Sequence, residues 1–134
     1  MQVFHEPLRL YPSAWVIGRA LAKPATVGGY ALPADAQLLV SPWATHRSAR
    51  NWSDPLDFDP DRFAPENRGR VHTFAYIPFG GGARKCIGTH LALIEGPMLL
   101  AAIAQHFRVD VPEQEMVLKG GVAIDVTSGT RAHI

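Results

Sequence analysis

The chain carries one cysteine, Cys86, in the glycine-rich run Phe79-Gly-Gly-Gly-Ala-Arg-Lys-Cys-Ile-Gly88. Three successive glycines let a backbone adopt unusual dihedral angles and approach a ligand closely. We expect a helix to begin near Ile87. The partial positive charge at its N-terminus, together with the cation of Arg84, favours a thiolate over a thiol. The run is therefore suited to presenting an anionic sulfur ligand.

Other interpretations of this run compete with that one. A phosphate-binding P-loop requires Gly-Lys followed by Ser or Thr, whereas Lys85 precedes Cys86. A zinc site needs several Cys or His at short spacing, and the six histidines are scattered along the chain. A cysteine nucleophile with His90 as its base stays open, because four residues separate the two on one expected helix face. A buried structural cysteine is the ordinary interpretation of an isolated thiol.

The composition is that of one globular domain. The chain has 134 residues, 47% hydrophobic and 19% charged, which suffices to bury a core. Thirteen Lys and Arg against 12 Asp and Glu leave a net charge of +1, so no nucleic-acid partner is expected. The N-terminus lacks the pattern of a signal peptide, and no apolar run is long enough to span a bilayer. These features, with one unpaired cysteine, predict a cytoplasmic protein.

Hydrophobic periodicity and the placement of proline and glycine predict an α+β chain with two longer helices and small β ribbons. One helix is expected over residues 2–11, with Pro7 close to its start, and the other over Gly88–Phe107. One or two helical turns over residues 42–50 and a long irregular stretch over 51–78 lie between them. The predicted strands cover residues 15–17, 26–27, 30–32, 37–40, 107–111, 115–118 and 122–126.

The run around Cys86 resembles the haem-binding loop of the cytochrome P450 family, Phe-Gly-x-Gly-x-Arg-x-Cys-x-Gly, at every fixed position. The matching residues are Phe79, Gly80, Gly82, Arg84, Cys86 and Gly88. The resemblance implies that Cys86 is the axial ligand of the iron of haem b, that Phe79 packs beside the sulfur, and that Arg84 pairs with a haem propionate. It makes Gly80, Ile87 and Gly88 cofactor-binding positions as well.

Two further motifs support this resemblance. Glu6 and Arg9 match the Glu-x-x-Arg pair of the family, and their spacing places carboxylate and guanidinium on one helix face. The segment Asp59–Phe63 looks like the family's Pro-x-Arg-Phe segment. The resemblance implies that Arg62 joins Glu6 and Arg9 in a buried triad, because a forked guanidinium can pair bidentately with a carboxylate.

The resemblance runs from about Val3 to the C-terminus. Residues 1–134 are therefore expected to form a single partial domain, the C-terminal haem-binding region of the mainly-α cytochrome P450 fold. Full-length members run to several hundred residues and contain a long helix across the distal face of the haem, which carries an acid–alcohol pair for O₂ activation. We assign no catalytic residue in this chain. The apolar face of the 88–107 helix would pack on helices that the chain lacks, so we expect self-association.

The resemblance implies a haem-thiolate monooxygenase, which inserts one oxygen atom from O₂ into an organic, hydrophobic substrate. A thiolate ligand donates electron density trans to O₂ and favours O–O cleavage. Electrons would come from a redox protein, a ferredoxin or a flavoprotein reductase. Substrate would contact residues 13–17 and the turn near 118–122. The alternative is a truncated, non-catalytic haem-binding or interaction fragment of the same family, which shares every motif.

Overall fold

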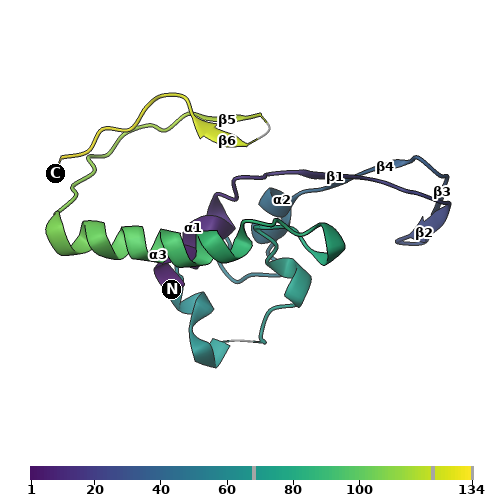
Figure 1. The fold of residues 1–134 in the computed structure, drawn as a ribbon, viewed down its shortest axis with the longest axis horizontal. Helices are drawn as coiled ribbons and strands as arrows, with labels where there is room; N and C mark the ends of the chain where they lie inside the picture. Colours follow the sequence, from purple (N-terminus) through teal and green to yellow (C-terminus); the bar gives the residue numbers. More distant parts are fainter. Residues whose placement is uncertain (68, 122, 134) are drawn as a thin grey trace.

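The computed structural model describes residues 1–67, 69–121 and 123–133 and has the α+β character expected from the sequence (Figure 1). The helices are α1 (Gln2–Leu10), α2 (Pro42–His46) and α3 (Thr89–His106). The strands are β1 (Ile17–Ala20), β2 (Ala25–Val27), β3 (Tyr30–Leu32), β4 (Gln37–Val40), β5 (Leu118–Gly120) and β6 (Ile124–Val126). Short 3₁₀ turns lie at Pro60–Phe63, Pro65–Asn67, Thr73–Ala75 and Gly82–Arg84.

The strands pair as antiparallel two-stranded ribbons, β1 with β4, β2 with β3, and β5 with β6. The first two ribbons form one arm that extends away from the helices (Figure 1). Val27 pairs with Tyr30, so Gly28 and Gly29 alone make the turn at the tip of the arm. Both adopt positive φ, +56° and +86°, which a two-residue hairpin turn requires.

Helix α1 differs from its prediction in two respects. Pro7 lies inside the helix, beyond the first turn, rather than close to its start. Its missing N–H is tolerated because Pro7 is on the exposed face. The opposite face buries Glu6, Arg9 and Leu10, and the helix ends at Leu10, one residue earlier than predicted.

The core lies where α1 meets the stretch 51–78. This stretch has little regular structure, yet it supplies most of the buried apolar side chains. Phe63 and Tyr76 pack with ring centroids 4.8 Å apart, and Trp52 lies 5.9 Å from Phe63. The buried apolar residues are Leu10, Trp52, Ala64, Ala75 and Ile77. The irregular segment is thus a packed part of the domain.

Helix α3 contacts α1 at a close approach between Gly96 and Phe4. A Cβ on Gly96 would lie 2.1 Å from Cε2 of Phe4, so any other residue at this position would force the Phe4 ring to move. Most apolar side chains of α3 face outward. The largely exposed ones are Leu91, Ile94, Met98, Leu99, Leu100 and Ile103.

The strand predictions were partly wrong. The first strand begins at Ile17 rather than at residue 15, because Trp15 belongs to the connection after α1 and its carbonyl accepts from the Ser41 hydroxyl at 3.0 Å. Residues 107–111 form no strand, and only Asp110 makes an isolated bridge, to His133. The strand predicted at 115–118 occupies Leu118–Gly120, since this is the part that pairs with β6. The predicted strand 122–126 is observed from Ile124, and Val122 lies outside the described residues.

Among the residues described, no helix is both long and apolar enough to cross a membrane.

Candidate functional site

The glycine-rich run folds into a loop closed by its own backbone. The N–H of Cys86 donates to the carbonyl of Phe79 at 2.9 Å, and the N–H of Gly80 donates to the carbonyl of Ile77 at 3.0 Å. Gly80 and Gly82 adopt φ of +72° and +70°, a region that other L-residues rarely occupy. The expected unusual dihedral angles are therefore confirmed at these two glycines.

Cys86 lies immediately before α3 rather than on it. The helix begins at Thr89, two residues later than expected. The hydroxyl and the N–H of Thr89 both donate to the carbonyl of Cys86, at 2.7 and 3.3 Å. The expectation that Cys86 and His90 share a helix face is wrong, because only His90 is helical. A cysteine nucleophile with His90 as its base therefore loses its geometric basis.

The side chain of Cys86 is exposed, so the interpretation as a buried structural cysteine is wrong. Ile87 is 100% exposed, which is unusual for an isoleucine that follows a closed loop. A Cβ on Gly88 would lie 3.8 Å from Sγ of Cys86, so the glycine leaves that side of the sulfur open. These three residues form an uncovered, mostly apolar surface around one sulfur atom.

A hollow of about 330 Å³ lies against Cys86. Leu8 of α1 and Ile17 of β1 supply apolar walls. Arg84 and Arg19 also line it. The predicted residues that line it are Phe79, Gly80, Arg84 and Cys86, whereas Ile87 and Gly88 do not border it.

Arg19 was missed by the sequence analysis. It lies in β1, where the burial alternates along Ile17–Ala20, and Ile17 and Arg19 are the two less exposed positions. An arginine on the same strand face as an apolar residue was the available signal.

A second hollow, of about 380 Å³, lies between Trp15 and the β5–β6 ribbon. The indole N–H of Trp15 donates to the carbonyl of Gly121 at 2.8 Å, and the N–H of Ile124 donates to the carbonyl of Ser13 at 3.0 Å. The two segments expected to contact substrate therefore lie side by side in their described parts, residues 13–17 and 118–121.

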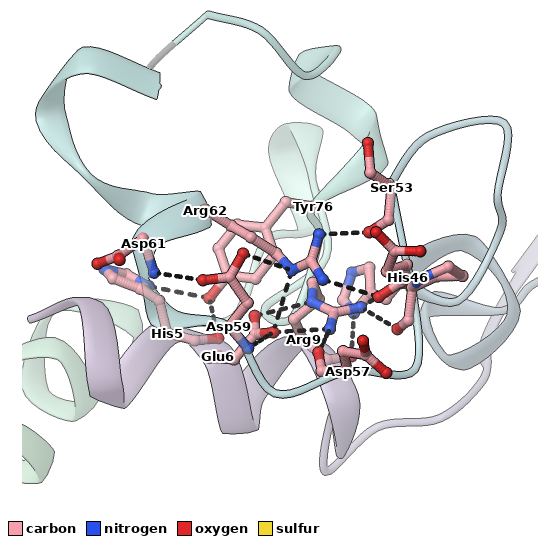
Figure 2. A network of polar contacts seen from close by, with 12 residues as sticks. His5, Glu6, Arg9, His46, Ser53, Asp57, Asp59, Asp61, Arg62 and Tyr76 are labelled. Carbon is pink, nitrogen blue, oxygen red and sulfur yellow. Dashed lines mark hydrogen bonds and ion pairs between the residues drawn. The ribbon is translucent and has the colours of Figure 1, made fainter.

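The predicted triad of Glu6, Arg9 and Arg62 is confirmed (Figure 2). Glu6 and Arg9 are fully buried and pair bidentately, with nitrogen–oxygen distances of 2.7 and 2.8 Å. Nε of Arg62 lies 3.3 Å from the same carboxylate. Glu6 also accepts from the N–H of Asp59 at 2.9 Å, which ties the irregular stretch to α1.

Arg9 reaches the same stretch through its remaining donors. Its guanidinium donates to the carbonyls of His46, Pro55 and Asp57 at 2.8, 2.6 and 3.0 Å. A single buried side chain thereby fixes the end of α2 and two points of a segment without regular hydrogen bonding.

His46 is fully buried at the end of α2, although the sequence analysis assigned it no chemistry. The N–H of Ile77 donates to its Nε2 at 2.8 Å, so the imidazole is neutral and its Nδ1–H donates to the carbonyl of Arg9 at 3.0 Å. Burial lowers the pKa of His46 to about 4, and the charges of Arg9 and Arg47 add to that effect. Beside it, burial and the carboxylate of Glu6 raise the pKa of Tyr76.

The residues around Cys86 fit a flat, largely apolar group with acidic substituents. The exposed sulfur has an open side at Gly88, the neighbouring side chain of Ile87 is apolar, and two arginines border the adjoining hollow. Across the described part of the chain, no group of three or more His, Cys, Asp or Glu is placed to hold a metal ion.

Comparison with known proteins agrees with this description. The chain belongs to the cytochrome P450 family, whose family model matches residues 1–121. It is 43% identical over 108 residues to cyclooctatin synthase of Streptomyces melanosporofaciens, covering 81% of this chain and 24% of that protein. It is 36% identical over 129 residues to cytochrome P450 4V2 of Mus musculus, covering 95% of this chain and 25% of that protein.

Among solved structures, the haem domain of cytochrome P450DA matches with a TM-score of 0.90 and 30% identity, over 98% of this chain and 30% of that one. The fold is that of the C-terminal part of a cytochrome P450. The family is a monooxygenase-type family with a haem cofactor, and its members generally use redox partner proteins, O₂ and hydrophobic substrates. The chain spans about a quarter of the length of the curated relatives named above.

Proposed function

We propose that Cys86 binds the iron of haem b as a thiolate and that the chain is the cofactor-binding portion of a haem-thiolate monooxygenase. The observation that carries this proposal is the exposed sulfur of Cys86, held by a closed backbone loop beside a hollow with two arginines. Family membership supports the class of reaction.

Different residues would contribute to haem binding in different ways. Gly80 and Gly82 let the backbone turn so that Cys86 is presented just before the N-terminus of α3. Phe79, Ile87 and the bare face of Gly88 would cover the cofactor and exclude water from the iron–sulfur bond. Arg84 and Arg19 would pair with its propionates.

When bound, the haem iron supplies activation of O₂ and insertion of one oxygen atom into substrate. The chain contributes the electron-donating thiolate. The hollow lined by Trp15, Leu118 and Ile124 is apolar enough to hold part of a hydrophobic substrate. Lys85 and Arg84 are exposed within the loop and suit an acidic redox protein, a ferredoxin or a flavoprotein reductase.

A second candidate is a haem-binding fragment of the same family without turnover. The residues that the structure describes support haem binding at Cys86, and none of them is assigned a catalytic role. In this case Cys86 would hold haem in the same way, and no oxygenated product would form.

One experiment separates these candidates. The chain is loaded with haem, reduced and exposed to carbon monoxide, and its difference spectrum is recorded. It is then supplied with a ferredoxin, its reductase and a panel of hydrophobic substrates. A thiolate-type spectrum with oxygenated product supports the monooxygenase, and the same spectrum without product supports the fragment. Absence of a thiolate-type spectrum contradicts both.

A further inference from the structure

We propose that His46 is a positioning residue for the Cys86 loop. It connects this loop to the buried ion pair of Glu6 and Arg9 on α1. The role in haem binding rests on the proposed function, whereas the connection itself concerns the chain alone. Among the contacts described above, His46 is the side chain that makes one hydrogen bond to Arg9 of this pair and another to Ile77 at the start of the loop.

The connection is a continuous series of hydrogen bonds. The Nδ1–H of His46 donates to the carbonyl of Arg9 at 3.0 Å, and its Nε2 accepts from the N–H of Ile77 at 2.8 Å. The carbonyl of Ile77 accepts from the N–H of Gly80 at 3.0 Å. The carbonyl of Phe79, which belongs to the same peptide group as the N–H of Gly80, accepts from the N–H of Cys86 at 2.9 Å.

This connection requires a neutral imidazole with one fixed tautomer. A proton on Nε2 would face the N–H of Ile77, donor against donor, and remove the bond that holds the entrance of the loop. His46 is fully buried, so water could not replace the lost partner without opening the structure.

The groups packed around His46 keep it neutral. Arg9 of α1 and Arg47, which follows α2, place two cations near it. Glu6 is the nearby carboxylate, and it is already paired with Arg9 and Arg62. Tyr76, from the segment before Ile77, lies with its ring centroid 5.5 Å from that of His46, and its raised pKa keeps it neutral as well.

A purely structural role would make different predictions from a positioning role. If His46 only filled space, its loss would loosen the whole core, including α1 and the stretch 51–78. If it positions the loop, the amides of Ile77, Gly80 and Cys86 would lose protection more than the rest of the chain. Amide hydrogen exchange distinguishes these two patterns without any cofactor.

The test compares three variants of the full chain at pH 7. His46→Phe keeps a ring but neither hydrogen bond, His46→Gln keeps one donor and one acceptor, and Leu10→Ala weakens the same core without touching the connection. We expect His46→Phe to reduce the protection of the Gly80 and Cys86 amides about 10- to 100-fold beyond its effect on α1. His46→Gln should restore part of it, and Leu10→Ala should lower protection evenly. An even loss in His46→Phe, like that in Leu10→Ala, would overturn the proposal.

A pH series on the wild-type chain decides the matter if His46→Phe does not fold. Between pH 7 and pH 4.5, protection of the loop amides, normalised to an unstructured chain, should fall selectively in wild type and not in His46→Gln. The same selective loss in both would overturn the proposal. In the haem-loaded chain, the thiolate share of the carbon monoxide spectrum should follow the same pH dependence. If the chain takes up no haem, the proposed function fails while the exchange result still decides the role of His46.

Discussion

The backbone N–H of Cys86 donates to the carbonyl oxygen of Phe79 at 2.9 Å and closes the glycine-rich run into a loop. The position of the sulfur is therefore set by main-chain hydrogen bonds and by the two glycines of positive φ, Gly80 and Gly82. Because the side chain of Cys86 is exposed and takes no part in this closure, it can be replaced without dismantling the loop. Substitutions at this position can then be interpreted as changes of ligand chemistry.

The open side of the sulfur depends on Gly88. Gly88→Ala places a methyl group 3.8 Å from Sγ, an ordinary contact that leaves the loop folded but occupies space beside the ligand. We expect haem affinity to fall about tenfold, since an added methyl in a close site costs about 1–3 kcal/mol. Haem titration followed by absorbance measures this. Gly18→Ala is the matched control, because its Cβ would meet nothing within 4 Å. An equal loss in both variants would refute a role for the space at Gly88.

The buried triad predicts a large effect of a small substitution. Glu6→Gln removes the carboxylate that Arg9 and Arg62 share, and leaves the fully buried guanidinium of Arg9 without a counter-charge. We expect the free energy of unfolding to fall by about 3–5 kcal/mol. Urea denaturation measures the free energy of unfolding. Glu66→Gln is the control, because Glu66 is exposed and its substitution changes the net charge by the same amount. A loss under about 1 kcal/mol would mean that the triad behaves like a surface ion pair.

His46 gives the fold a defined acid sensitivity. Its pKa is 6.5 in the unfolded chain and lowered to about 4 by burial in the folded one. Between these values the unfolded chain binds more protons than the folded one. The contribution of His46 to the free energy of unfolding is therefore fully present above pH 6.5 and decreases as the pH drops toward 4. The loss amounts to a few kcal/mol, at about 1.4 kcal/mol for each unit of pKa difference. Denaturation midpoints across this range measure the slope. His46→Gln should flatten it, and an unchanged slope would assign the acid sensitivity to other groups.

The sequence predicted the parts of the fold that depend on local pattern. The two longer helices, the Gly28-Gly29 turn and the glycine loop follow from periodicity and from backbone requirements of glycine. The triad could be predicted only from the family resemblance. Nothing in the local sequence indicates that Arg62 contacts a helix more than fifty residues earlier. The role of His46 could not be predicted, since it depends on how α2 packs against the loop, and the one local signal for Arg19 was its place on the same strand face as Ile17. The strand boundaries near Trp15 and after α3 were misplaced because pairing partners, rather than propensity, fix them.

The exposed face of α3 predicts self-association. Ile94 and Met98 are 62% and 66% exposed and lie one turn apart on the helix. In sedimentation velocity, we expect the wild-type chain to show a sedimentation coefficient that rises with concentration. The double variant Ile94→Lys/Met98→Lys should remain a monomer. Glu95→Lys, which changes the net charge by the same two units on the same helix, should still associate. A monodisperse wild-type monomer would contradict this expectation.

Iron-edge X-ray absorption of the haem-loaded chain detects the atoms bound to the metal and shows directly whether Cys86 is the ligand. We predict one sulfur ligand in the wild type and its replacement by a lighter atom in Cys86→Ser, while the loop stays closed. Met98→Leu, which removes another sulfur, should leave the iron–sulfur signal unchanged. A wild-type spectrum without sulfur, or a sulfur ligand that persists in Cys86→Ser, would contradict the assignment of Cys86 as the haem ligand.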